Sequence, residues 1–113
     1  MIEFSRGDVV LIRFIFADET GIKRRPAVIL SSQAYHAGRG EVIIAAITSR
    51  TDRILIGDHL IADWQGAGLL FPSVATSIIR TIKQDMVNQK LGSLSAEDTS
   101  GIDSKLKLAL GLL

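Results

Sequence analysis

The sequence predicts a mainly β domain, a small and strongly bent antiparallel sheet or barrel of short strands followed by one C-terminal helix. Short apolar runs separated by polar or glycine-containing turns occupy the chain as far as Ile82. The apolar residues take on a helical period only after Ser95. With 113 residues and no cysteine, residues 1–113 are expected to form a single domain with a core that needs no disulfide.

The predicted strands follow from the apolar runs. They are residues 9–16 after the Gly7-Asp8 turn, 27–32, 41–47, 54–62 with a bulge or bend at Gly57, and two short stretches within 69–82 around Pro72-Ser73. Both alternating faces of 9–16 are apolar apart from Arg13, so this strand should be covered on both sides. Residues 33–40 are expected to form an irregular connection.

The C-terminal segment carries the signals of a helix. Ser95-Ala96-Glu97-Asp98 has the form of a capping box. The apolar residues after it recur at helical spacing and are Ile102, Leu106, Ala109, Leu110 and Leu113. Gly101 lies within the helix and costs it about 1 kcal/mol relative to alanine. Tertiary packing must therefore stabilise this helix.

The net charge of +1 conceals a basic segment. Residues 23–53 contain six basic side chains and two acidic ones, Glu41 and Asp52. A concentrated patch on a near-neutral domain favours an anionic partner that binds at one site. No apolar run approaches the ~20 residues of a membrane helix, and no signal peptide is recognised. We therefore expect no membrane association and a cytoplasmic location.

The densest cluster of cations precedes a proline, in Lys23-Arg24-Arg25-Pro26. Because proline cannot donate to a sheet ladder, Pro26 is expected at the first residue of its strand. It also favours an extended conformation at Arg25. A guanidinium held at the rim of a sheet suits phosphate recognition. The alternative is a solvated run of charges at the start of a strand.

Several kinds of site lack their sequence signals. His36 and His59 show no metal-ligand spacing, so no metal or other cofactor is expected. Glycine-rich phosphate loops and the GxSxG elbow are also missing. Each histidine is expected to be a surface or hydrogen-bonded residue, although one sequence neither supports nor excludes a catalytic triad.

Arginines and hydroxyl groups remain as the candidate chemistry. If the strands pair compactly, their ends converge on one rim that would hold Arg24, Arg25, Thr48, Ser49, Ser73 and Arg80. Such groups suit binding a phosphodiester and stabilising the charge that develops on it. They suit proton abstraction poorly unless a carboxylate such as Glu19, or a histidine, assists.

An ordered set of motifs resembles the PemK/MazF toxin family. The motifs are Gly7-Asp8-Val9-Val10, Lys23-Arg24-Arg25-Pro26-Ala27-Val28-Ile29-Leu30, Ala46-Ile47-Thr48-Ser49, Gly68-Leu69-Leu70-Phe71-Pro72-Ser73-Val74, Ile79-Arg80-Thr81-Ile82 and Leu91-Gly92-Ser93-Leu94. They span about residues 6–110. Each motif alone is weak, but their order and spacing are specific.

The resemblance implies an SH3-like barrel with a C-terminal helix that forms a homodimer. It implies a type II toxin that cuts single-stranded RNA, such as mRNA, at short sequences, without metal, by attack of the ribose 2′-hydroxyl on the adjacent phosphate. Its partners would be RNA and a cognate antitoxin, and it would meet DNA only through the antitoxin complex. An acidic, partly disordered antitoxin tail would suit the basic segment.

The resemblance also implies roles for individual residues. Arg25 matches the catalytic arginine and Thr48 the catalytic threonine, and Glu19 lies in a loop that often carries an acidic residue. The side chains expected to contact substrate are Glu19, Arg24, Ser49, Arg50, Arg53, Ser73 and Arg80. Arg80 is alternatively a packed structural arginine. Trp64 or Tyr35 would stack on a base, with rim packing as the preferred interpretation for Trp64.

One departure weakens the enzyme assignment. Many family members carry an acidic residue three positions before the arginine of the Arg-Thr-Ile segment, where this chain has Ser77, with Ala75 nearby. Two alternatives therefore stay open. One is a barrel that inhibits a protein target such as DNA gyrase, and the other is a catalytically degenerate module that serves as an antitoxin partner and co-repressor.

Overall fold

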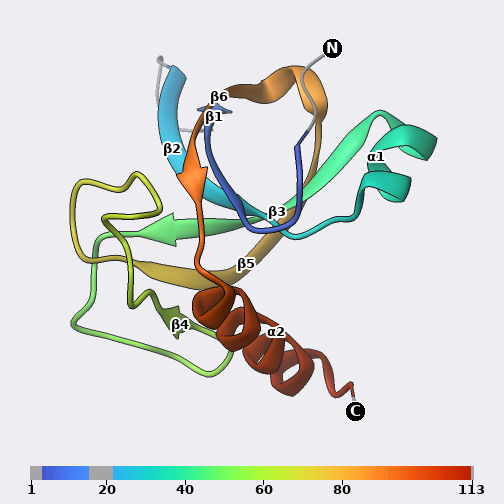
Figure 1. Ribbon diagram of the computed structural model, residues 1–113. Helices are drawn as coiled ribbons and strands as arrows, with labels where there is room; N and C mark the ends of the chain where they lie inside the picture. Colours follow the sequence, from blue (N-terminus) through green and yellow to red (C-terminus); the bar gives the residue numbers. More distant parts are fainter. Residues whose placement is uncertain (1–3, 16–21, 113) are drawn as a thin grey trace.

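The protein is described by a computed structural model that covers residues 4–15 and 22–112 (Figure 1). The elements in chain order are β1 (Asp8–Ile15), β2 (Ile22–Ile29), α1 (Gln33–Arg39), β3 (Glu41–Thr48), β4 (His59–Leu60), β5 (Val74–Lys83), η1 (Gln84–Met86), β6 (Val87–Ser93) and α2 (Ala96–Leu110).

The strands of the described residues form one sheet in the order β4-β5-β3-β2-β1-β6. Every neighbouring pair is antiparallel. The sheet bends strongly, but its end strands β4 and β6 do not pair with each other within the described part of the chain (Figure 1). The predicted mainly β fold with a C-terminal helix is confirmed, as a bent sheet that does not close.

Apolar side chains pack on both faces of the central strands. The larger core contains Val9, Val28, Ala45, Ile47, Ile61, Ala67, Leu69, Ala75, Leu94 and Ile102. The smaller core contains Phe4, Val10, Ile12, Ala27, Ile29, Val42, Ile44 and Val87. Because successive strand residues point to opposite faces, Val9 and Val10 enter different cores. The prediction that the first strand is covered on both sides is confirmed for these residues.

The second strand begins earlier than predicted. β2 starts at Ile22, so Pro26 lies inside the strand, and the expectation of Pro26 as its first residue is wrong. Pairing with β3 begins only at Ala27. At Pro26 the edge of β2 that faces β3 is therefore unpaired, and the missing N–H of proline removes no hydrogen bond between the two strands.

The segment 54–62 is mostly irregular, with a turn at Ile56-Gly57, rather than the predicted strand, and only His59–Leu60 form β4. The buried carboxylate of Asp58 explains this, because it accepts hydrogen bonds from the backbone N–H of Leu55 at 3.0 Å and of Ser77 at 3.1 Å. Gly57 adopts a φ of 96°, which bends the chain beside them. The two short strands expected in 69–82 are instead the single strand β5, which starts after Pro72-Ser73.

Three elements were not predicted, namely α1, the short η1 and β6. Residues 33–39 form α1, whose N-cap Ser32 accepts a hydrogen bond from the Tyr35 N–H. β6 is mostly polar, and apolar alternation therefore did not reveal it. It pairs with β1 through two register shifts, which bend the strand around the sheet.

The C-terminal helix begins at the predicted capping box. Ser95 is the N-cap, and its side chain accepts a hydrogen bond from the Asp98 N–H. The apolar face of α2 is buried only as far as Leu106, through Ile102 in the larger core and the half-buried Leu106. Leu108, Leu110 and Leu112 are exposed, and Leu113 lies outside the described residues. None of the helices described is long and apolar enough to cross a membrane.

Candidate functional site

The candidate site lies where β2 and β3 separate. The two strands pair at Ala27↔Ala46, Val28↔Ala45 and Ile29↔Ile44, and the ladder stops there. Continuing this register by two residues would set Arg25 opposite Thr48, the last residue of β3. The strands diverge instead from Pro26, which has no N–H to donate. The divergence opens the edge of the sheet between the two predicted catalytic residues.

A pocket of about 400 Å³ occupies this region. It is lined by Leu11, Arg25, Pro26, Ile47, Thr48, Ser49, Gly68, Leu69, Leu70, Phe71, Ser73 and Leu91. Most of the lining is apolar, and one guanidinium and three hydroxyl groups supply polar contacts. This composition is typical of a ligand site, in which few polar groups fix the orientation.

Two glycines bring the wall of the pocket together. A Cβ at Gly68 would lie 2.7 Å from the Leu91 carbonyl carbon, and a Cβ at Gly92 would lie 2.6 Å from the Ala67 carbonyl oxygen. The loop before β5 and the middle of β6 therefore touch backbone to backbone. Gly68 also has a φ of 83°, which side chains rarely allow. These contacts give a physical reason for two of the glycine-containing motifs.

The hydroxyl groups of the pocket differ in their availability. Thr48 Oγ1 accepts a hydrogen bond from the Arg50 N–H at 3.1 Å, which leaves its own proton to donate to a ligand. Ser73 is buried, and its hydroxyl donates to the Phe71 carbonyl at 2.7 Å. Ser49 is exposed at the end of β3. Thr48 and Ser49 are therefore better placed than Ser73 to bind a ligand.

The remaining predicted cations lie outside the pocket lining. Arg50 forms an exposed ion pair with Asp52 at 3.0 Å, and Arg53 is exposed in the turn that follows. Arg80 pairs with Ile44 in the middle of the sheet and lies six residues along β5 from Val74, roughly 20 Å at the rise of an extended strand. The structure therefore does not bring Arg80 to the rim. Glu19 lies outside the described residues.

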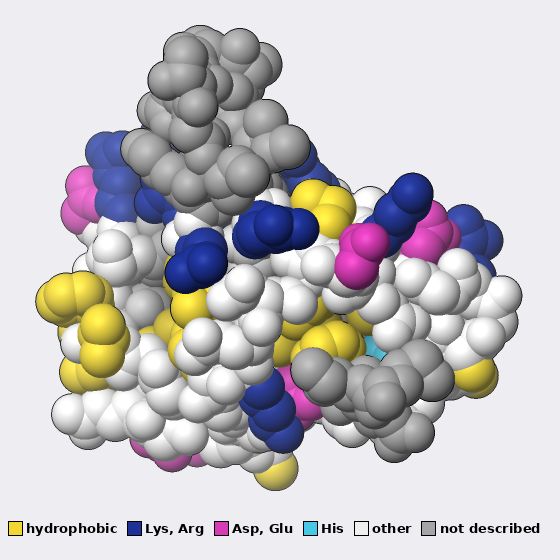
Figure 2. All heavy atoms as spheres, turned by 90° about the horizontal axis from the view of Figure 1, so that it is seen from above, with side chains coloured by type: hydrophobic (Ala, Val, Ile, Leu, Met, Phe, Trp, Pro, Cys, Tyr) yellow, Lys and Arg dark blue, Asp and Glu magenta, His cyan; other side chains and the backbone are white. Residues whose placement is uncertain are grey.

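Arg24 continues one face of the sheet beyond the pocket. Three successive pairs between β1 and β2 share that face. Val9 and Val28 lie in the larger core, and the next pair, Leu11 and Pro26, lines the pocket. The pair beyond them is Arg13 and Arg24. Both arginines are exposed. Arg13 had been noticed only as a break in an apolar strand. Figure 2 shows Lys and Arg side chains gathered on the face seen from above, with hydrophobic side chains exposed beside several of them.

The histidines are structural. His36 is buried, and its Nε2 lies 2.6 Å from Ser31 Oγ, which also accepts a hydrogen bond from the Ile43 N–H. His59 Nε2 donates to Asp98 Oδ1 at 2.8 Å. Both fulfil the expectation of hydrogen-bonded residues.

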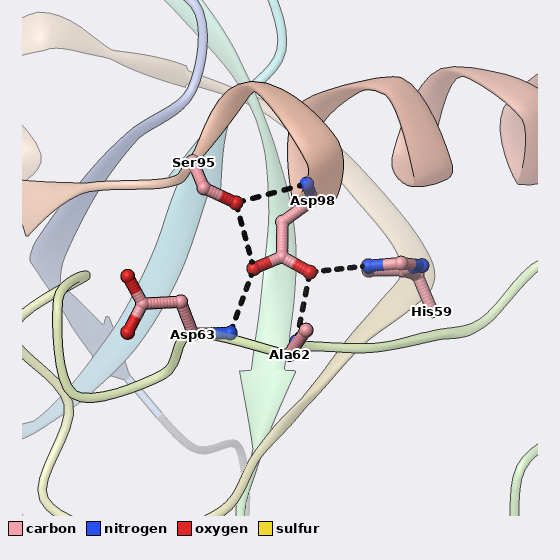
Figure 3. A network of polar contacts seen from close by, with 5 residues as sticks. All are labelled: His59, Ala62, Asp63, Ser95 and Asp98. Atoms are coloured by element: carbon pink, nitrogen blue, oxygen red, sulfur yellow. Dashed lines mark hydrogen bonds and ion pairs between the residues drawn. The ribbon is translucent and has the colours of Figure 1, made fainter.

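Asp98 is the centre of a buried network that joins α2 to the loop after β4 (Figure 3). Its carboxylate accepts hydrogen bonds from His59, from the N–H groups of Ala62 and Asp63, and from Ser95 Oγ. Burial alone would raise the pKa of Asp98, but these hydrogen bonds outweigh it, so the pKa is lowered from 3.8. The network fixes the start of the loop that supplies Leu69–Phe71 to the pocket.

The aromatic residues considered for base stacking have other contacts. Trp64 is half-buried and packs against the larger core, as the preferred interpretation expected. The Tyr35 ring lies beneath the Arg39 guanidinium, 5.2 Å from the ring centroid. Phe71, which sequence analysis did not consider as a site residue, is the aromatic residue that lines the pocket. Its position before Pro72-Ser73 in a family motif was the available signal.

Ser77 occupies the position, three residues before Arg80, where the family resemblance leads one to expect an acidic residue. Ser77 lies in β5, and its backbone N–H is bound by the buried Asp58 carboxylate. Ala75 is buried in the larger core. Asp58 holds two backbone N–H groups and shapes the turn at 54–58, so its role is structural.

The arrangement offers recognition and charge stabilisation. Arg25 supplies a permanent cation, and Thr48 supplies a hydroxyl donor at the same opening. The apolar lining lowers the local dielectric and strengthens both interactions. A ligand with an anionic group and an apolar surface would match the pocket.

Comparison with known proteins identifies one family. The model described as PemK-like, MazF-like toxin of type II toxin–antitoxin system matches residues 5–110. No match was found among curated proteins.

Solved structures of the same fold include toxins and their complexes. An endoribonuclease in complex with its cognate antitoxin from a mycobacterial species has a TM-score of 0.77 and 22% identity, and the match covers 98% of each chain. A MazE–MazF structure from Deinococcus radiodurans gives 0.78 and 22%, with 96% of each chain covered. The Mycobacterium tuberculosis toxin MazF-mt6 gives 0.76 and 23%, covering 94% of this chain and 98% of its own. At this identity the likeness establishes the fold.

Proposed function

Since this chain belongs to the PemK-like, MazF-like toxin family of type II toxin–antitoxin systems, we propose that it is an endoribonuclease that cleaves single-stranded RNA, such as mRNA, in the cytoplasm. The observation that supports this most directly is the shared pocket of Arg25 and Thr48. The sequence separates these residues by half of β2, the helix α1 and most of β3. The antiparallel pairing of β2 with β3 sets them near each other, and the pocket opens where that pairing ends.

The proposed reaction is metal-independent and uses a nucleophile that the substrate carries. The ribose 2′-oxygen attacks the adjacent phosphorus, the bond from phosphorus to the 5′-oxygen breaks, and the 2′-hydroxyl proton is transferred, directly or through water, to the departing 5′-oxygen. Arg25 binds the phosphate and stabilises its growing negative charge. Thr48 donates its hydroxyl to a phosphate oxygen. The requirement for a 2′-hydroxyl distinguishes RNA from DNA.

Other predicted residues would contribute to substrate binding to different extents. Ser49 lines the pocket and is exposed, so it is placed to bind a phosphate oxygen. Ser73 would act mainly by fixing the loop, because its hydroxyl is bound to Phe71. Arg24, Arg50 and Arg53 would contact phosphates farther along the strand through screened charge interactions. Arg80, far from the pocket, is better assigned to packing or to another surface.

We propose a homodimer and a cognate antitoxin as protein partners, and contact with DNA only through the antitoxin complex. A relative of the same fold was solved with its cognate antitoxin, which supports the antitoxin. Among the described residues, the exposed apolar side chains include Ile54, Leu55, Ile56, Leu108 and Leu110. These residues and the end of α2 are better candidates for the dimer surface than Val9, Val10 and Ile12 of β1, which are buried inside the monomer.

The test of the nuclease is cleavage of a long single-stranded RNA with metal chelated, followed by mapping of the 5′ ends. We expect defined fragments from the wild type and a loss of at least 100-fold with Arg25→Ala, since removal of one such stabilising group costs about 2.7–4 kcal/mol. Arg39→Ala removes the same charge from the exposed Arg39–Glu41 pair and should cleave normally. Equal cleavage by Arg25→Ala and wild type would exclude this mechanism.

A catalytically degenerate antitoxin-binding module is the second candidate, favoured by Ser77 at a position that is often acidic. It predicts tight antitoxin binding without RNA cleavage or growth arrest on expression. A gyrase-inhibitor type of activity predicts growth arrest that survives Arg25→Ala. Induced expression of the wild type and this variant separates all three outcomes.

A further inference from the structure

Two large apolar side chains stand exposed at the rim of the pocket. Leu70 is 82% exposed and Phe71 is 62% exposed, although both line the cavity that contains Arg25 and Thr48. The segment is anchored by buried residues at its two ends, Leu69 in the larger core and Ser73 at 4% exposure. The fold therefore exposes Leu70, Phe71 and Pro72 between two buried residues.

This part of the chain is held in place by its flanking residues. The Leu69 N–H donates to the Trp64 carbonyl at 3.0 Å, and the Ser73 carbonyl accepts from the Ile61 N–H at 3.0 Å. The Ser73 hydroxyl holds the Phe71 carbonyl, and Pro72 restricts Phe71 to an extended conformation. Because the backbone on both sides is fixed, the main chain that carries the ring is pre-organised, and binding to the ring does not have to order this backbone.

The chemistry of the pocket indicates what covers the ring. A guanidinium and two available hydroxyl groups require a ligand with anionic oxygen atoms, and an aromatic face at the same opening requires a flat apolar group. A nucleotide carries both groups in one unit, and aromatic side chains are the usual stacking platforms for bases of single-stranded nucleic acids.

We propose that Phe71, flanked by Leu70, stacks on a base of the RNA next to the phosphate bound by Arg25. This inference rests on the proposed function, which supplies RNA as the ligand. Stacking of this kind tolerates any base, so Phe71 contributes affinity and positions the strand rather than selecting its sequence.

The first test compares RNA with an anion that has no bases. Poly(U) and inorganic polyphosphate are the two probes, and binding is measured by competition against a labelled RNA. We expect Phe71→Ala to weaken poly(U) binding by about 5- to 150-fold, the equivalent of about 1–3 kcal/mol per stacked base, while polyphosphate binding changes less than twofold. Ile78→Ala, at a residue of similar exposure (60%) on β5 that does not line the pocket, is the matched control and should change neither.

A second test detects stacking directly. In a Trp64→Phe background, Phe71→Trp places the only indole at the rim, and poly(U) should change its fluorescence whereas polyphosphate should not. The stacking assignment would be overturned if Phe71→Ala weakened the binding of poly(U) and of polyphosphate equally, or if it weakened the binding of neither probe. A Phe71→Ala defect limited to an acidic antitoxin peptide would also overturn it, because it would assign the ring to the protein partner.

The two proposals fail separately. If Arg25→Ala abolishes cleavage while Phe71→Ala binds poly(U) normally, the nuclease stands and the platform is rejected. If Phe71→Ala weakens poly(U) selectively and no RNA is cleaved by the wild type, the platform stands and the nuclease is rejected.

Discussion

The buried carboxylate of Asp98 provides the sharpest test of how the fold holds the site. Asp98→Asn conserves the shape of the side chain but replaces one acceptor oxygen with an NH₂ donor. Asp98 is fully buried, and Oδ1 accepts from His59 and Ala62 while Oδ2 accepts from Asp63 and Ser95. The amide oxygen of asparagine can serve only one of these two pairs.

The expected cost follows from the better of the two orientations. If the amide oxygen replaces Oδ1, the NH₂ group faces the Asp63 N–H, and this part-buried donor loses its acceptor at a cost of about 1–3 kcal/mol. The loss of negative charge in the first turn of α2 adds about 0.3–1 kcal/mol. We therefore expect the free energy of unfolding to fall by about 1.5–4 kcal/mol, a large fraction of the ~5–15 kcal/mol of a typical domain.

The measurement is urea unfolding at neutral pH, followed by far-UV circular dichroism and by Trp64 fluorescence. Glu97→Gln is the matched control, because it removes a charge from the same turn of α2 at an exposed position. That variant should lose no more than about 1 kcal/mol. Equal losses in Asp98→Asn and Glu97→Gln would refute the assignment of the buried network.

The pH dependence gives a second reading of the same residue. The pKa of Asp98 is lowered from 3.8 in the folded protein, so its contribution is complete above about pH 3.8 and is lost as the pH falls through the folded pKa. The difference in stability between the wild type and Asp98→Asn should therefore narrow on acidification below pH 3.8. A constant difference across that range would contradict the direction of the shift.

Two glycine substitutions test the close contacts of the fold. In an open helix, Gly101→Ala would stabilise the protein by about 1 kcal/mol. Here it should lower the stability, because its Cβ would lie 2.6 Å from His59 Nδ1. Adding His59→Ala to the same chain should relieve that loss, and thermal unfolding measures both effects. Gly92→Ala should cost about 1–3 kcal/mol through overpacking, since its Cβ would meet the Ala67 carbonyl oxygen at 2.6 Å, and urea unfolding measures the loss. Gly38→Ala in α1 has open space around the new methyl group, so it should be neutral or stabilising; destabilisation there as large as at Gly92 would count against the contact argument.

Local rules predicted those elements whose residues carry a strong periodic or capping signal. The first and third strands, Asp8–Ile15 and Glu41–Thr48, and the start of α2 at Ser95 were expected within a residue. β6 and the turn at 54–58 were missed, because contacts with distant segments determine them. β6 follows β1 through two register shifts, and Asp58 fixes the turn by binding Ser77.

The sequence by itself determined the mainly β class with a C-terminal helix, the concentration of cations in 23–53 and, through its resemblance to a toxin family, the two residues proposed for catalysis. It carried no information on which of the candidate site residues in different strands lie near each other. The tertiary structure decided this through register, because the ladder between β2 and β3 ends at Ala27↔Ala46 and opens a pocket that includes Arg25 and Thr48 but leaves Arg80 far along β5. It also left Phe71 exposed at the rim of that pocket, in the segment between the buried residues Leu69 and Ser73.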